Sequence, residues 1–397
     1  MLINHSTTET SPHPTDIEGE LRDDLARLRN ELARLENAIE SLDPSSGHLT
    51  GISTASGAIA TAGLDWEVVK EPLRLNDCHS ASPQEKNHVL VRTSPGSGPN
   101  RVILGRVAED YTPLQNREAL ALLDPLVQAG TAEYHSAGAV DHGRRVWVLG
   151  RLLKPARIKG ADTLDRYLLL VNNHTGASPQ VQMRLMPHRL FCSNMLAAEI
   201  EMGRKVSITA AGDVYVQLQQ AKESVRQVEQ NYSAIESVFR RMADTPMTTD
   251  GAAEYVKEVL PEPVQTNPEE EHDPLRRLRE LANTLFETGK GNDQPGIRGT
   301  LWAAYNGITE LVDHHIPDES PEARLGRIWF GSGHEIKIRA YTVAIRWLRV
   351  ATRAENWRSV GNRKELPRAI RRTAELPVVH PSGSMQKQAA ELCAALP

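Results

Sequence analysis

The stretch Arg166–Arg189, RYLLLVNNHTGASPQVQMRLMPHR, contains two apolar runs separated by the polar link NNHTGASP. Gly176 and Pro179 in this link are typical of a turn, because glycine tolerates positive φ and proline has a fixed φ. Apolar runs of strand length on both sides of a turn predict a β-hairpin. We expect two antiparallel strands here, followed by a helix over about residues 189–202 that starts near Phe191.

This part of the chain also holds three possible metal ligands, His174, His188 and Cys192. The two histidines are fourteen positions apart, and no fourth Cys or His lies nearby in the sequence. Structural zinc usually takes four ligands in two close pairs. A hairpin with no metal and no cofactor is therefore the favoured interpretation, and a three-ligand metal site is the alternative.

Four more short runs rich in β-branched residues precede the hairpin. They are WEVVKEPLRL (66–75), HVLVRT (88–93), RVILGRV (101–107) and RRVWVLGRLL (144–153). Several links between the runs are of hairpin length, which favours a mostly antiparallel sheet. One helix is expected to interrupt the sheet over residues 116–130, with Asn116 as its N-cap and Gly130 as its terminator.

Two stretches repeat apolar residues at alternating spacings of four and three, the pattern of a coiled-coil seam. The first comprises Leu21, Leu25, Leu28, Leu32, Leu35, Ile39 and Leu42, and the second comprises Val214, Leu218, Ala221, Val225, Val228, Tyr232, Ile235, Phe239 and Met242. Each leucine that pairing buries is worth about 1.5–3 kcal/mol. We therefore expect self-association through these helices, or packing of the first seam on the second within one chain.

Further helices are expected in the C-terminal half, at 274–288, 298–315 and 334–351. The predicted fold class is α+β, with a mostly antiparallel sheet core, a helical C-terminal half and an N-terminal coiled-coil helix. Its parts are a polar N-terminus with the coiled-coil helix (1–44), an α+β sheet domain (45–210), a long heptad helix with a short helix (211–260), an acidic linker (261–274), a helical domain (275–351) and a basic, poorly ordered tail (352–397).

Composition limits the class and location of the protein. The 397 residues are 40% hydrophobic and carry a net charge of −5, so the chain as a whole is not strongly basic. No apolar run reaches the length of a membrane span, and the polar N-terminus lacks the apolar region of a signal peptide. The three scattered cysteines form no CxxC pair, which fits a reducing compartment. We expect a cytoplasmic protein with no membrane partner.

Common catalytic motifs are missing from the sequence. ETGKGNDQPG around Lys290 does not match the phosphate-binding loop GxxxxGK[ST], and PGSGPN and FGSGHE do not match GxSxG, so both are interpreted as flexible turns. Glu310 and His314 lie one helical turn apart and could bind a cation, but an apolar stripe on the same helix leaves them on a solvated face. We therefore favour a non-enzymatic protein and assign no catalytic residue.

Eight blocks of the sequence resemble one known family. They are GLDWEVVKEPL, GRVAEDYTPLQNREAL, GRRVWVLGRLL, RYLLLVNNHTG, MPHRLFCSNML, RMADTPMT, RGTLWAAYNGITELVDHH and FGSGHEIKIRA. From about Gly63 to Ala344 they follow the order found in the phage/plasmid-like proteins grouped as domain of unknown function 932. The resemblance implies a gene carried by mobile elements, and it supplies no catalytic residues. The N-terminal coiled coil departs from the short N-terminus of that family.

Basic residues are concentrated in one segment of the predicted sheet. Six lie within residues 144–159 with no acidic residue among them: Arg144, Arg145, Arg151, Lys154, Arg157 and Lys159. Strand alternation places Arg145, Trp147 and Arg151 on one face, where cations would contact a phosphate backbone and the indole could stack on a base. The alternatives are that the cations are solvated or paired with acidic neighbours, and that Trp147 lies in the core.

The helix expected at 334–351 carries a second basic stripe. It consists of Arg339, Arg346, Arg349 and Arg353. Between Arg324 and Arg372 the chain has thirteen Lys or Arg residues against three Glu. Such a helix suits nucleic acid, an acidic membrane surface or an acidic partner segment, and the chain's own PEEEHD is one such segment.

These features predict a non-enzymatic DNA-binding protein of a mobile element, which coats or anneals single-stranded DNA during recombination or replication. Phage annealing proteins offer an analogy, because they also work without ATP and as oligomers. The alternative is an oligomeric structural or host-interaction protein with no nucleic-acid role. A small hydrolase with a metal near His174 or His314 is a third, less favoured option.

Overall fold

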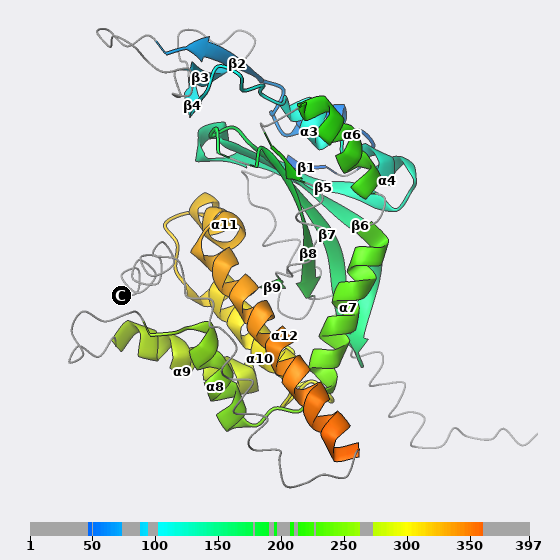
Figure 1. Cartoon of the computed structure of the whole chain (residues 1–397), viewed down its shortest axis with the longest axis vertical. Coiled ribbons are helices and arrows are strands. Elements are labelled where there is room, and N and C mark those ends of the chain that lie inside the picture. Colours follow the sequence, from blue (N-terminus) through cyan, green and yellow to red (C-terminus); the bar gives the residue numbers. More distant parts are fainter. Residues whose placement is uncertain are drawn as a thin grey trace, which may run out of the picture. The chain divides into compact units, whose positions relative to one another are not determined.

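The computed structural model describes residues 47–49, 51–73, 88–93, 102–177, 179–189, 194–196, 207–209, 213–225, 228–262 and 273–359 (Figure 1). The first predicted seam, the three cysteines and most of the basic tail lie outside the described residues. Within them the α+β fold is confirmed, because two antiparallel sheets precede a mainly helical C-terminal half.

The larger described sheet has seven strands in the order β1-β5-β6-β7-β8-β10, with β9 pairing β8 off this path. The strands are β1 Gly47–His48, β5 Ala132–Val140, β6 Arg145–Lys159, β7 Asp162–Asn173, β8 Val181–Arg189, β9 Asn194–Met195 and β10 Ser207–Ile208. The predicted hairpin is confirmed as β7 and β8, whose antiparallel pairing runs from Leu164↔Arg189 to Asn172↔Val181.

A smaller sheet packs against the turn of this hairpin. Its antiparallel strands are β2 Glu67–Pro72, β3 His88–Thr93 and β4 Val102–Val107. Gly176 in the turn has φ +76, and a Cβ there would overlap the carbonyl of Arg106. A Cβ on Gly105 of β4 would likewise overlap the backbone of Thr175. Glycine at both positions therefore lets the smaller sheet approach the hairpin turn directly.

The helix expected over 189–202 is wrong where the structure describes this segment. Asn194 and Met195 form β9, which pairs with His188 and Arg189 at the end of β8. The apolar run after the hairpin is short, and periodicity does not separate strand from helix in short apolar runs.

The helix expected over 116–130 is divided into two. The two helices are α3 Asn116–Leu120 and α4 Asp124–Gln128. Pro125 stands at the start of α4, where its missing N–H prevents a preceding helix from continuing. Gln115 rather than Asn116 is the N-cap of α3. Gly130 does end the segment, with φ +66.

The second predicted seam is buried inside the chain. Its residues are shared by α6 Val214–Val225 and α7 Val228–Asp244, and all nine are buried. Helix α7 packs on the sheet, where the hydroxyl of Tyr232 donates to the carbonyl of Tyr167 and Arg166 pairs with Glu229 at 2.7 Å. This seam therefore has no exposed apolar face to offer a second copy.

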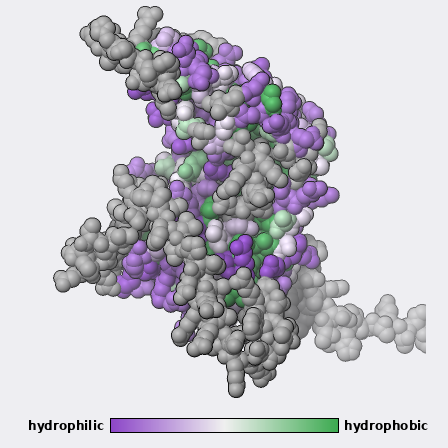
Figure 2. Space-filling view, in the orientation of Figure 1, coloured by the Kyte–Doolittle hydropathy of each residue, from purple (hydrophilic) through white to green (hydrophobic). Residues whose placement is uncertain are grey.

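The remaining helices lie mostly in the C-terminal half. They are α2 Ala55–Thr61, the 3-10 turn η1 Asp141–Gly143, α8 Thr249–Val259, α9 Asp273–Thr288, α10 Leu301–Glu310, the π-helix η2 Leu311–His315, α11 Pro321–Phe330 and α12 Ser332–Ser359. The three predicted C-terminal helices correspond to α9, to α10 with η2, and to α12, whereas α11 was not anticipated. In the described part of the chain no helix is long and apolar enough to cross a membrane. Figure 2 shows mainly hydrophilic residues on the described surface of that view.

A buried arginine connects the large sheet to the C-terminal helices. Arg189, at the end of β8, donates from Nε to both carboxylate oxygens of Asp162 at 3.0 Å. Its Nη atoms donate to the carbonyl of Gly291 at 2.8 Å and to the side chain of Asn292 at 3.1 Å. Trp302 of α10 donates its indole N–H to Asp162 at 2.7 Å. One carboxylate thus holds β7, β8 and α10 in a single network.

Candidate nucleic-acid interface

Strand β6 places its basic residues as alternation requires. Its register with β7 is unbroken from Arg145↔Asn173 to Leu152↔Arg166, so Arg145, Trp147 and Arg151 share one face. Trp147 is 3% exposed, and its ring meets that of Trp329 edge-on at 5.0 Å between centroids. The opposite residue of β5 is Gly138, where a Cβ would stand 2.8 Å from the indole. Trp147 is therefore a core residue and is not exposed for stacking on a base.

The two arginines on this face have acidic partners. Arg145 pairs with Asp141 of η1. Arg151 pairs with Glu133 of β5 at 3.4 Å and with Asp165 of β7 at 3.3 Å. Burial by itself lowers the pKa of Arg151, but Asp165, the neighbouring tyrosine and Glu133 raise it above its ordinary value. Much of the charge expected to meet phosphate is therefore balanced within the sheet.

Tyr167 lies beside Arg151 and between two histidines on the same face. Its ring centroid is 5.1 Å from that of His135 and 5.9 Å from that of His188, both in edge-on contact. Together with Glu133 and Asp165, the two carboxylates that pair with Arg151, these residues form a polar cluster of both acids and bases. Among the described residues, however, no group of three or more His, Cys, Asp or Glu side chains is arranged to hold a metal ion.

His174 lies at the other end of the hairpin and belongs to the core. It is fully buried, and its Nε2 is 2.9 Å from the side-chain oxygen of Asn116 and 3.3 Å from the amide nitrogen of Asn172. Its ring meets Trp66 edge-on at 5.6 Å. Burial lowers the pKa of His174 to about 4, so the imidazole is neutral at pH 7. These contacts join the hairpin to α3 and to Trp66, the residue before β2.

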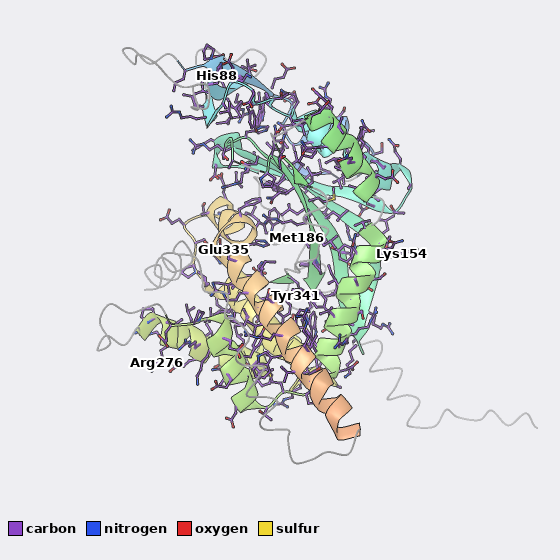
Figure 3. The ribbon with its side chains drawn as sticks, in the orientation of Figure 1. His88, Lys154, Met186, Arg276, Glu335 and Tyr341 are labelled. Atoms are coloured by element: carbon purple, nitrogen blue, oxygen red, sulfur yellow. The ribbon has the colours of Figure 1, made fainter. Side chains whose placement is uncertain are left out.

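The exposed cations of β6 lie where the strand continues past β5. The last pairing with β5 is Ala132↔Leu152, and Lys154 and Arg157 beyond it are exposed, with no ion pair in the part of the chain that the structure describes. Figure 3 labels Lys154 at the side of the sheet next to α7. Arg144, before the first residue of β6, is also exposed. The predicted basic stripe is thus two separate sites, one at each end of the strand.

Two further cations lie at the end of β6, its last residue Lys159 and Arg240 of the neighbouring α7. Arg240 of α7 donates to the carbonyl of Arg157 at 3.1 Å and pairs with Glu236, and Lys159 pairs with Asp244 at 2.8 Å. We call Lys154, Arg157, Lys159 and Arg240 the hairpin patch. Its four positive charges face two carboxylates, which leaves a net charge of +2.

The basic stripe of α12 is largely anchored to α8. Arg339 donates to the carbonyl of Val259 at 3.0 Å, and Arg346 pairs with Glu258. Arg349 is exposed, and the side chain of Arg353 lies outside what the structure describes. The helix therefore presents fewer unpaired cations than its sequence suggests.

Glu310 and His314 do not share a solvated face, which corrects the sequence-based expectation for Glu310. Glu310 is 4% exposed and accepts the backbone N–H of Lys290 at 2.9 Å. Burial is the largest influence on its carboxyl group and raises the pKa of Glu310. The π-helix places His315, not His314, opposite this carboxylate at 3.9 Å, because its wider turn shifts the phase of the side chains.

Sequence reasoning missed a second group of cations near α11 and α12. Arg184 of β8 donates to the carbonyl of Trp329 at 2.7 Å, and the fully buried Lys337 pairs with Asp313 at 2.8 Å. FGSGHE (330–335) was expected to be a flexible turn, which is wrong, because it contains the end of α11, Gly331 and the first four residues of α12. A glycine-rich turn before a long helix was the available signal.

A family model described as Domain of unknown function (DUF932) matches residues 103–361. The chain belongs to this family. The part matched by DUF932 begins in β4 and continues past the end of α12, so it includes the hairpin, the hairpin patch and the C-terminal helices. No curated protein and no solved structure gives a significant match to the chain.

Proposed function

We propose that this DUF932 protein is a non-enzymatic DNA-binding protein of a mobile element that favours single strands and assists recombination or replication. The observation that carries the proposal is the hairpin patch. Lys154 and Arg157 in it are exposed and have no ion pair among the described residues. A cation in this situation loses no protein partner when it contacts a phosphate, whereas Arg151 would have to leave two carboxylates.

The patch accounts for weak, salt-sensitive binding. Each phosphate neutralised on a single strand contributes about −0.7 to the slope of log affinity against log salt, so two contacts correspond to about −1.4. Stacking on Trp147 adds nothing, because the indole is buried. Useful affinity would then require several copies on one strand, since linked sites raise the effective concentration. Pairing through the seam at residues 21–42 would supply such copies.

An oligomeric structural or interaction protein is the second candidate. It is favoured by the ion pairs of Arg145, Arg151 and Arg346 within the chain, because the sequence analysis expected these three arginines to contact phosphate.

The test is fluorescence anisotropy with a labelled oligo-dT strand and a duplex of equal length at low salt. The double variant Lys154→Glu, Arg157→Glu should bind the single strand at least about tenfold more weakly, because two contacts become repulsive. The matched control is Arg117→Glu, Lys257→Glu, which changes the net charge equally at exposed positions on α3 and α8. If both variants lost the same affinity for the single strand, the effect would be one of net charge and not of the hairpin patch. If the parent did not bind DNA, the second candidate would be favoured.

A further inference from the structure

The junction between α11 and α12 is a glycine-rich turn at the start of a long helix. Gly331 ends α11 and Ser332 begins α12, which has 28 residues. A Cβ on Gly333 would stand 3.0 Å from the carbonyl oxygen of Arg327 and from a methyl group of Val312, so the backbone packs closely here. The first N–H groups of such a helix have no acceptor within it, and they carry the positive end of the helix dipole.

Three cations, Arg184, Arg327 and Lys337, lie near this turn. Arg184 reaches the last turn of α11, where it donates to the carbonyl of Trp329, and it also donates to the amide oxygen of Gln182 at 2.7 Å. Both acceptors are neutral, so Arg184 has no carboxylate partner in the described part of the chain. Two of the five guanidinium N–H groups are used, and three remain. Burial first, and then the charge of Arg145, lower the pKa of Arg184.

Two nearby cations do have carboxylate partners. Lys337 pairs with Asp313, and Arg327 pairs with Asp318 at 2.6 Å. The guanidinium of Arg327 lies 3.2 Å from the position that a Cβ on Gly333 would take. Because these two cations are paired, Arg184 is the one of the three that has no ion pair among the described residues.

His334 supplies the second, independent observation. It is the third residue of α12, and its Nδ1 is buried without a hydrogen-bond partner among the described residues. Burial, followed by the charges of Arg184 and Lys337, holds the pKa of His334 well below its ordinary value, so the ring is neutral. A buried polar atom without a partner costs about 1–3 kcal/mol, and native proteins rarely keep one without a bound group or water.

We propose that the start of α12, Ser332–His334, binds the phosphate group of a small molecule, through its backbone N–H groups, Nδ1 of His334 and the guanidinium of Arg184. Phosphate fits because helix N-termini bind oxyanions and arginine matches their geometry. Arg184, Ser332 and His334 are each only partly exposed, which favours a small phosphate over the long backbone of DNA. Glu335, the acidic residue of the first turn of α12, opposes the anion (Figure 3). This site is separate from the hairpin patch and does not depend on DNA binding.

The test is calorimetric titration of the full chain with inorganic phosphate at constant ionic strength. The parent should bind at one saturable site, and Arg184→Met should bind roughly tenfold more weakly because a charge-assisted contact is lost. Glu335→Gln should bind more tightly, since it removes the opposing charge. Arg349→Met, which removes an exposed cation further along α12, should bind like the parent.

Several results would overturn the proposal. They are an absence of saturable binding by the parent, unchanged affinity in Arg184→Met, or unchanged affinity in Glu335→Gln. The last variant keeps the test decisive if Arg184→Met fails to fold. Saturating phosphate should leave binding of the dT strand unchanged at constant ionic strength, and competition between them would overturn the assignment to a small ligand. Loss of DNA binding in the hairpin-patch variant has no bearing on this outcome.

Discussion

Replacing Arg189 with methionine should strongly destabilise the fold, because it leaves a buried carboxylate without its cation. The side chains of Arg189 and Asp162 are both 0% exposed, so solvent does not screen their interaction. Removing one partner of a buried ion pair costs about 3–5 kcal/mol. The backbone carbonyl of Gly291 and the side chain of Asn292 would also lose a donor. Since a domain is stable by only about 5–15 kcal/mol, the variant should lie close to unfolding.

The measurement is urea unfolding followed by both circular dichroism and tryptophan fluorescence, so that any intermediate is seen. The control is the double variant Asp162→Asn, Arg189→Met, in which no charge remains buried. We expect it to be more stable than Arg189→Met alone, because the orphaned carboxylate accounts for most of the cost. A loss below about 1 kcal/mol in the single variant would refute this reasoning. So would a double variant no more stable than the single one.

The remaining predictions concern pH and assembly. The pKa of His174 is about 4 in the folded chain and 6.5 ordinarily, so its contribution to stability is complete above pH 6.5 and is lost as the pH falls towards 4. The full effect is on the order of 3 kcal/mol, and urea unfolding at pH 7.5 and 5 should show a smaller pH dependence in His174→Gln than in the parent. Deleting residues 1–44 removes the first seam and should lower the number of chains per particle, which is obtained from the mass measured by light scattering. An unchanged number of chains would mean that this seam does not join copies.

Local patterns were enough to predict the elements whose signal lies within a short window. The β7–β8 hairpin follows from two apolar runs and a glycine-containing turn, and the buried seam of α6 and α7 follows from its spacing. Alternation also placed Arg145 and Arg151 on one face correctly. The spacing along β6 does not predict the ion-pair partners of Arg151, because Glu133 and Asp165 come from neighbouring strands. The site was therefore harder to predict than the fold.

The errors have equally specific causes. The solvated position expected for Glu310 assumed that its helix has one exposed face, whereas all ten residues of α10 are buried. The helix expected after the hairpin rested on an apolar run too short to distinguish the two periods. FGSGHE was interpreted as a flexible turn because of its glycines, although α12 begins within it, and only the folded chain brings Arg184 from β8 to this point.

The part of β6 that continues past β5 also limits how copies of the chain can join. An unpaired strand edge is a template on which another chain can add a strand. Here Pro155 has no N–H to donate, the carbonyl of Lys154 already accepts from Arg166, and that of Arg157 accepts from Arg240. Exposed Lys154 and Arg157 would in addition repel the same residues of an incoming copy. Sheet extension between molecules is therefore disfavoured at this edge.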